Sequence, residues 1–173
     1  MNDIYSQKII DFTTLSAKYC LELEQVAQNE NPKEFIKKLL LLLPLLYTKA
    51  TQLVDDIEDN GEYTENQVTE DDYNYIRNNI YSLIAQYDEY LDVFVEDMKY
   101  SDKPILKSIS EDLADIYQDL RNFLAIYELG IEAQSSAALY EVIQQFTTYW
   151  GQRVVNVTRA LHEIIYNEIL EDC

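Results

Sequence analysis

The stretch of residues 108–130 reads SISEDLADIYQDLRNFLAIYELG. Its apolar residues recur every three or four positions, which is the period of one face of an α-helix. Gly130 at its end is the residue type that commonly follows the last helical turn. We therefore predict an amphipathic helix whose buried stripe consists of Ile109, Leu113, Ile116, Leu120, Phe123, Leu124 and Tyr127.

The same period continues in both directions from this segment. Asn31 and Pro32 form a typical helix start, and Thr69 followed by Asp72 resembles a capping box. Gly151 falls in the middle of the last periodic stretch, where it marks a weak point or a close-packing point. Four further helices are predicted over residues 3–28, 32–57, 69–98 and 135–170.

The chain length and the scarcity of turn-forming residues narrow the fold class. The 173 residues match one domain, and only 3 Gly and 3 Pro argue against a fold with many tight hairpins. Short connections favour antiparallel neighbours. We predict an all-α fold, an up-and-down antiparallel bundle of about five long helices in one domain over residues 1–173, with the helix 32–57 in the middle.

Charge and composition exclude several classes of function. The 13 Lys and Arg against 32 Asp and Glu give a net charge of −19, which argues against nucleic acid as a partner. One His and two Cys cannot form a Cys₂His₂ or His₃ zinc site, and no cofactor is expected. The longest apolar run, Leu39 to Tyr47, is too short for a membrane span. Because the first residues also lack the pattern of a secretory signal, we expect a cytoplasmic protein that does not bind membranes.

Three segments carry a family resemblance: LPLLYTKA at 43–50, SISEDLADIYQDL at 108–120 and WGQRVVNVTRALH at 150–162. Together with residues 12–23, they resemble a bacterial family of acidic helical proteins classified as a domain of unknown function. The resemblance spans nearly the whole chain and is weakest over residues 61–100. It implies a single helical domain, and it implies no activity, substrate or cofactor.

Two cations fall near stripes that should be buried. Arg153 aligns with Phe146 and Trp150, and Lys49 lies near the line of the apolar residues of its helix. A cation that faces a core must be paired or must line a cavity. One interpretation is a surface or structural ion pair, and the other is a small-anion-binding pocket. The candidate ligand-binding residues are Lys49, Tyr47, Asp112, Asp119 and Arg153, with Tyr117 as a further hydroxyl partner.

A metal-dependent nucleotide pyrophosphohydrolase is an alternative reading. It would use carboxylates on two facing helices as metal ligands, namely Glu89, Asp92, Asp112 and Asp115. At 100° per residue, most of these side chains point away from the apolar stripes, so a solvated acidic face explains them more simply. No catalytic residue is assigned.

The 15 Tyr stand out against 5 Phe and 1 Trp. Tyrosine suits interfaces because it offers a large contact area and a polar tip. Combined with the net charge of −19, this favours a non-enzymatic protein-interaction module that binds a basic protein partner. The simpler alternative is that tyrosines line helix contacts and acids keep the protein dissolved. The tyrosines expected away from the stripes are Tyr63, Tyr75, Tyr81 and Tyr100, and the oligomeric state stays open.

Overall fold

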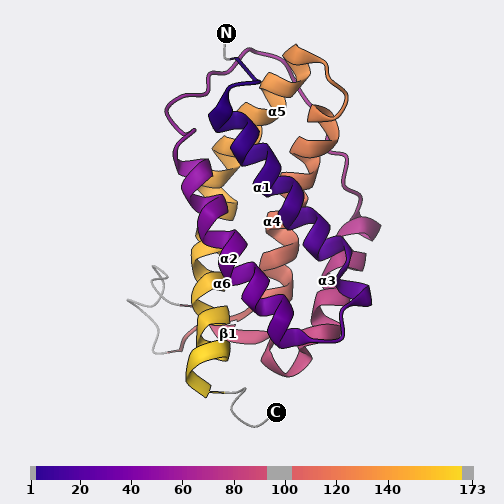
Figure 1. Ribbon diagram of the computed structural model, residues 1–173, viewed down its shortest axis with the longest axis vertical. Helices are drawn as coiled ribbons and strands as arrows, with labels where there is room; N and C mark the ends of the chain where they lie inside the picture. The colour runs from indigo at the N-terminus through magenta and orange to yellow at the C-terminus, as the bar shows by residue number, and fades with distance from the viewer. Residues whose placement is uncertain (1–2, 93–102, 169–173) are drawn as a thin grey trace.

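The computed structural model describes residues 3–92 and 103–168 (Figure 1). Within these ranges the chain is mostly helical, as predicted, with one small sheet. The α-helices are α1 (Gln7–Glu24), α2 (Pro32–Thr51), α3 (Glu70–Ile84), α4 (Ile109–Tyr127), α5 (Glu132–Gln145) and α6 (Gly151–Glu163). Short 3₁₀ segments are Val26–Gln28 and Ala85–Tyr87, π-helical segments are Phe146–Trp150 and Ile164–Glu168, and the strands are β1 (Glu89–Leu91) and β2 (Leu106–Ser108).

Five helical rods result, because α5, the π segment Phe146–Trp150 and α6 follow one another without a break. The expected helix starts are confirmed where side-chain caps were recognised in the sequence. Thr69 and Asp72 form both bonds of a capping box, and the Asn31 side chain accepts a hydrogen bond from the Glu34 amide. Gly130 follows α4 with a φ of +70°, a backbone conformation that glycine adopts without strain.

Helix α4 lies at the centre of the bundle. It packs against α1, α3, α5 and α6, and most of its residues are buried. The ring of Phe123 contacts that of Phe12 of α1, and Phe12 in turn lies against Trp150. Buried side chains from all the helices join into a single hydrophobic core around these rings.

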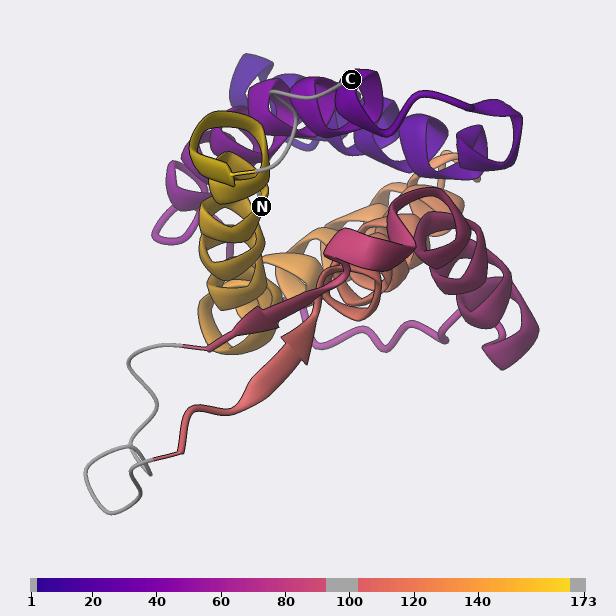
Figure 2. The same ribbon diagram turned by 90° about the horizontal axis from the view of Figure 1, so that it is seen from below.

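The prediction that the second helix lies in the middle is therefore wrong. Helix α2 packs against α1 and α6 and forms, with α1, an outer layer in front of α4 (Figures 1 and 2). Its apolar run buries Leu39, Leu43 and Leu46 but leaves Leu41 and Leu45 exposed. A run that is apolar on all sides thus covers both a core-facing and an outward face. Across the described ranges, no helix has the length and hydropathy needed to cross a membrane.

The predicted third helix is too long at its C-terminal end. It ends at Ile84, and a 3₁₀ turn leads into an antiparallel hairpin in which Glu89 pairs with Ser108 (Figure 2). The reason is Asp88, whose carboxylate accepts hydrogen bonds from the Ser108 and Ser110 hydroxyls and from the Ser110 amide at 2.6–3.0 Å. Asp88 thereby caps the start of α4 and diverts the chain from a helical path. Phe94 and Met98, also predicted on this helix, lie outside the described residues.

Gly151 is a close-packing point, one of the two predicted alternatives. A Cβ atom at this position would lie 2.4 Å from the Phe146 carbonyl oxygen and 2.9 Å from two carbons of the Phe146 ring. The π segment before it contains Trp150, whose indole N–H donates to the Val142 carbonyl oxygen at 2.9 Å. Glycine is therefore required for the tight approach of the backbone to Phe146.

Candidate functional site

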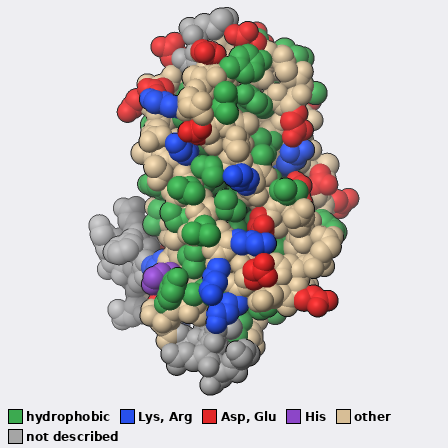
Figure 3. Space-filling model, in the orientation of Figure 1, with side chains coloured by type: hydrophobic (Ala, Val, Ile, Leu, Met, Phe, Trp, Pro, Cys, Tyr) green, Lys and Arg blue, Asp and Glu red, His purple; other side chains and the backbone are tan. Residues whose placement is uncertain are grey.

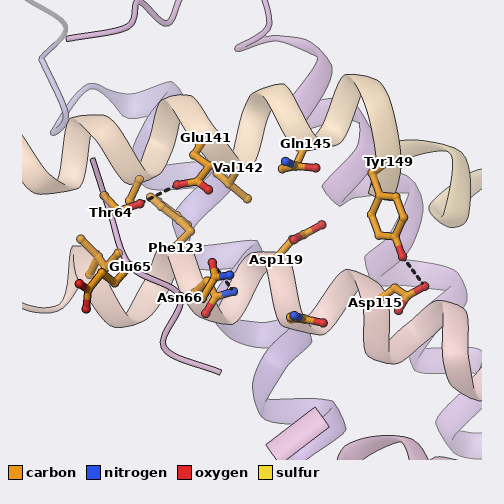
Figure 4. Close-up of a pocket in the computed structure, with 14 residues that line it drawn as sticks. Thr64, Glu65, Asn66, Asp115, Asp119, Phe123, Glu141, Val142, Gln145 and Tyr149 are labelled. Carbon is orange, nitrogen blue, oxygen red and sulfur yellow. Dashed lines mark hydrogen bonds between the residues drawn. The ribbon is translucent and has the colours of Figure 1, made fainter. Parts of the chain in front are cut away.

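A polar pocket of about 300 Å³ opens between α4, α5 and the extended segment 64–66 (Figure 4). Carboxylates and carboxamides dominate its lining, and none of its described lining residues is Lys, Arg or His. The carboxylates are Glu65, Asp115, Asp119 and Glu141, and the carboxamides are Asn66, Gln118, Asn122 and Gln145. Phe123, Ile126, Ala138 and Val142 form the apolar floor, and Thr64 and Tyr149 complete the rim.

The pocket residues of α4 share one side of the helix because they recur at three- and four-residue intervals. One of them, Asn122, also holds the opposite wall: its side-chain oxygen accepts hydrogen bonds from the Gln67 and Val68 amides at 2.7 and 2.8 Å. The Thr64 hydroxyl donates to the Glu141 carboxylate of α5 at 2.6 Å. The segment 64–68 is thus bonded to both helices, which fixes the shape of the pocket.

Asp115 is surrounded by donors. Its Oδ1 accepts a hydrogen bond from the Tyr73 hydroxyl at 2.8 Å. Its Oδ2 accepts from the Tyr149 hydroxyl at 2.9 Å and from Nε of Arg153 at 3.2 Å. The Arg153 guanidinium also lies over the Tyr149 ring, 3.6 Å from its centroid. These contacts join α3, α4 and the α5–α6 rod, so Asp115 is a structural carboxylate.

Asp119 lies one turn further along α4 and is not satisfied in this way. Its Oδ2 atom is buried and has no hydrogen-bond partner among the described residues. In Figure 4 the carboxylate points from α4 into the space toward α5, where Gln145 lies on the opposite side. Burial, followed by the charges of Asp115 and Glu141, raises the pKa of Asp119 to about 7, although Arg153 opposes the shift. This carboxyl group therefore changes its charge near neutral pH.

Asp112, on the side of α4 nearer the hairpin, is also buried. It accepts a short hydrogen bond from the Tyr90 hydroxyl of β1. Burial raises the pKa of Asp112 to about 6, and the Tyr90 hydrogen bond and the positive charges of Lys107 and Arg153 limit the rise. The hairpin is further tied to α6 because Arg159 donates to the Leu91 carbonyl oxygen at 2.6 Å.

Known proteins match nearly the whole length of this chain. The model of a family described as a domain of unknown function, DUF5063, matches residues 3–167. The chain belongs to this family. The chain is also similar to protein BF1032 from Bacteroides fragilis, whose crystal structure matches with a TM-score of 0.84 at 34% sequence identity, over 97% of this chain and 98% of that one. No curated protein matches.

The resemblance that the sequence indicated, to a bacterial family of unknown function, is thereby confirmed. The match includes residues 61–100, where the resemblance was weakest. Neither the family description nor the name of the Bacteroides fragilis protein states an activity.

The five candidate ligand-binding residues are not gathered in one pocket of this DUF5063 member. Of the five, only Asp119 lines the pocket between α4 and α5. Nζ of Lys49 lies 2.9 Å from the Asp11 carboxylate, and the Tyr47 ring contacts the ring of Phe146. Arg153 pairs with Asp115 and not with Asp112 or Asp119, the two carboxylates among the candidate residues.

The expected hydroxyl partner Tyr117 points elsewhere and donates to Glu24 at 3.0 Å. Both cations are therefore held in ion pairs, which is one of the two predicted alternatives. Arg153 still influences Asp112 and Asp119, because its positive charge limits the rise in the pKa of each carboxyl group.

The four carboxylates of the hydrolase alternative have different bonding partners in this DUF5063 member. Glu89 lies on an exposed strand and not on a helix, which corrects the prediction. Asp92 accepts a hydrogen bond from Asn156 at 3.4 Å, and Asp112 and Asp115 are bonded to tyrosine hydroxyls. In the part of the chain that the structure describes, no three His, Cys, Asp or Glu side chains are grouped so as to hold a metal ion.

Sequence reasoning missed most of the pocket, because only Asp115 and Asp119 of its lining were among the candidates. Glu141, Gln145 and Tyr149 lie on the far wall, and Thr64 and Asn66 come from the connection between the helices predicted over residues 32–57 and 69–98. Spacing along α5 contains a signal, because Glu141 and Gln145 are four residues apart and both are polar. Nothing in the sequence indicates which helix they face. Three of the tyrosines expected away from the core, Tyr63, Tyr75 and Tyr81, are exposed, and Tyr100 lies outside the described residues.

Proposed function

We propose that this protein is a non-enzymatic binding module whose acidic pocket receives a cationic side chain of a basic protein partner. The observation that carries the proposal is the buried Oδ2 atom of Asp119, which lacks a partner in the described part of the chain and borders the pocket. A buried carboxylate oxygen normally accepts a hydrogen bond, because leaving it without one costs about 1–3 kcal/mol or more. A donor from outside the chain would remove this cost.

The chemistry of the lining favours a cation over an anion. Asp119 and Glu141 supply negative charge from opposite walls, and the carboxamides offer further oxygen acceptors. A guanidinium group has five N–H donors in a planar fork, and it bonds well to carboxylates and amide oxygens that converge on one space. An anionic ligand would instead meet carboxylates on two sides. The small-anion alternative therefore has less support than a cation site.

Long-range electrostatics favour the same kind of partner. Residues 52–173 contain 7 Lys and Arg against 26 Asp and Glu, so they carry the whole net charge of −19. The pocket lies within this part of the chain. A field of one sign attracts an oppositely charged partner and speeds its association. The hydrolase alternative has less support, because protein donors occupy Asp112 and Asp115.

The proposal is tested by the binding of a fluorescent arginine-rich peptide to the full-length chain, measured by fluorescence anisotropy. A peptide with citrulline in place of each arginine is the matched control, because citrulline retains the shape and lacks the charge. We expect Asp119→Asn and Glu141→Gln to weaken arginine-peptide binding by about tenfold each, as for the loss of a charge-assisted hydrogen bond. Glu30→Gln, which makes the same charge change at an exposed position outside the pocket, should leave binding unchanged.

The pH dependence gives a second, independent readout. A bound cation favours the ionised form of Asp119, whose pKa in the free protein is about 7. Affinity for the arginine peptide should therefore rise by up to about tenfold from pH 6 to pH 8, and Asp119→Asn should remove this rise. Equal binding of the citrulline peptide, or wild-type affinity in Asp119→Asn, would overturn the proposal.

A further inference from the structure

The outward side of α1 and α2 differs in charge from the rest of the molecule. Residues 1–51 contain six lysines and six acidic residues, so their net charge is zero, whereas the remaining residues carry the full −19. All six lysines lie on or directly beside these two helices. Figure 3 looks onto this side and shows lysine side chains scattered among hydrophobic ones.

The same side exposes large aliphatic side chains. Leu41 is 71% exposed, Leu45 51% and Leu21 of α1 52%. At 100° per residue, Leu41 points about 160° away from both Leu39 and Leu43, which face the core, so it cannot contribute to the interior. Leu41 and Leu45 are four residues apart and form a continuous apolar ridge. We define the α1–α2 face as Lys18, Leu21, Glu34, Lys37, Lys38, Leu41 and Leu45.

Ion pairs on and beside this face show that both signs of charge occur there. Nζ of Lys38 lies 3.3 Å from the Glu22 carboxylate of α1 and 3.7 Å from that of Glu34. Because lysine and glutamate both occur on this face, a lysine of one copy can meet a glutamate of the other. Residues 1–51 also have no net charge, so two copies that meet there repel each other less than two copies that meet through the acidic remainder. Contact between two copies through residues 52–173 would instead bring like charges together, which costs free energy at moderate ionic strength.

We infer that the α1–α2 face binds a second copy of this chain in a symmetric dimer, with Leu41 and Leu45 at the centre of the contact. A two-fold contact uses the same patch on both copies, and an apolar ridge flanked by both lysine and glutamate meets this requirement in chemistry. Two neighbouring helices of 18 and 20 residues present an area of about 600 Å² if each is about 30 Å long and about 10 Å wide. About 600 Å² from each copy is near the lower end of specific interfaces, so this area suits a dimer that forms reversibly with rising concentration.

The test is sedimentation equilibrium of the full chain from low micromolar to submillimolar concentration. The wild type should pass from monomer to dimer with rising concentration, and added salt should strengthen the dimer because it screens the repulsion between the two acidic bodies. Leu41→Glu and Leu45→Glu should each weaken dimerisation by at least tenfold. Leu129→Glu is the matched control, because Leu129 is 67% exposed on the connection after α4, outside the face, and this variant should dimerise like the wild type.

Thermal unfolding of each variant shows whether a loss of dimerisation comes from the lost contact or from a damaged fold. The melting temperatures of Leu41→Glu and Leu129→Glu, measured at a concentration where the wild type is monomeric, should match that of the wild type. A monomer at every concentration would overturn the inference, as would equal dimerisation of Leu41→Glu. Oligomers that grow beyond dimers and dissolve in salt would overturn it in favour of head-to-tail contacts between α1–α2 and the acidic side. Co-sedimentation of monomers with vesicles of anionic phospholipid would overturn it in favour of a membrane surface.

Discussion

The two turns of α4 that carry Asp115 and Asp119 have the same residue type on the same side of one helix, yet their surroundings differ. Asp115 accepts hydrogen bonds from Tyr73, Tyr149 and Arg153, whereas one oxygen of Asp119 accepts none from the described residues. Asp115 connects three helical rods, and Asp119 faces an open pocket. The role of each carboxylate therefore depends on the donors that neighbouring helices supply and not on its position in an amphipathic pattern.

The largest expected effect comes from removing the acceptor at Asp115. Asp115→Ala leaves two tyrosine hydroxyls and a partly buried guanidinium without their shared partner, so we expect a loss of about 3 kcal/mol in the free energy of unfolding. Urea denaturation measures this loss. Asp115→Asn, which retains one acceptor oxygen, should lose less. If both variants unfold like the wild type, Asp115 is not structural.

A smaller loss is expected at the glycine that follows the π segment. Gly151→Ala places a methyl group against the Phe146 carbonyl and ring, so the segment that presents Tyr149 to Asp115 must shift. Overpacking of this kind costs about 2 kcal/mol. Thermal or urea unfolding measures it, with Gln152→Ala at the exposed neighbouring position as the control. Wild-type stability in Gly151→Ala would show that the π segment accommodates a side chain.

The smallest expected effect is a gain in stability, and it has the opposite sign to that at Asp115. The pKa of Asp119 is about 7 in the folded chain, and its ordinary value is 3.8. Between pH 3.8 and about pH 7, the folded chain therefore holds a proton that the unfolded chain has lost. Raising the pH through this window therefore destabilises the fold. Asp119→Asn removes the charge but keeps a buried amide that still needs hydrogen-bond partners, so only part of the penalty is recovered. We expect a gain of about 1 kcal/mol at pH 8 that shrinks toward pH 4.

This prediction is checked by urea denaturation of wild type and Asp119→Asn at a series of pH values. The Glu30→Gln control, at an exposed acid outside the pocket, should show no such trend. Asp112, whose pKa is raised to about 6, should leave a residual decrease of stability with rising pH in the Asp119→Asn variant. A variant that loses stability at pH 8 would show that the Asp119 carboxylate is satisfied in the folded protein.

Local patterns in the sequence predicted the helices but not all of their ends. Thr69 and Asp72 are close neighbours, so the capping box could be recognised without knowledge of the fold. The end of α3 depends on Asp88, whose bonding partners Ser108 and Ser110 lie 20 and 22 residues further along the chain. Tyr87 and Leu91 continue the helical period past this end. Contacts between distant residues therefore override a period that, read alone, predicts a longer helix.

The candidate site was predicted in part for the same reason. The acidic residues of α4 and the nearby cation Arg153 could be identified, because polar residues at the edge of an apolar stripe are visible in a helical wheel. The carboxylate that pairs with Arg153 could not be identified. A helical wheel uses a constant angle per residue and does not allow for the wider π-helical turn between Phe146 and Trp150. That turn rotates every later side chain relative to those before it.

The position of the single tryptophan provides an internal optical reporter. Trp150 is fully buried between Phe12 and Phe146. Its emission maximum should lie at short wavelength in the native protein and move to longer wavelength when water reaches the indole. The 15 tyrosines absorb light and transfer the excitation to nearby tryptophan, so loss of this transfer reports on expansion of the chain as a whole. Opening of the core and expansion of the chain can therefore be followed in one cuvette, without a label.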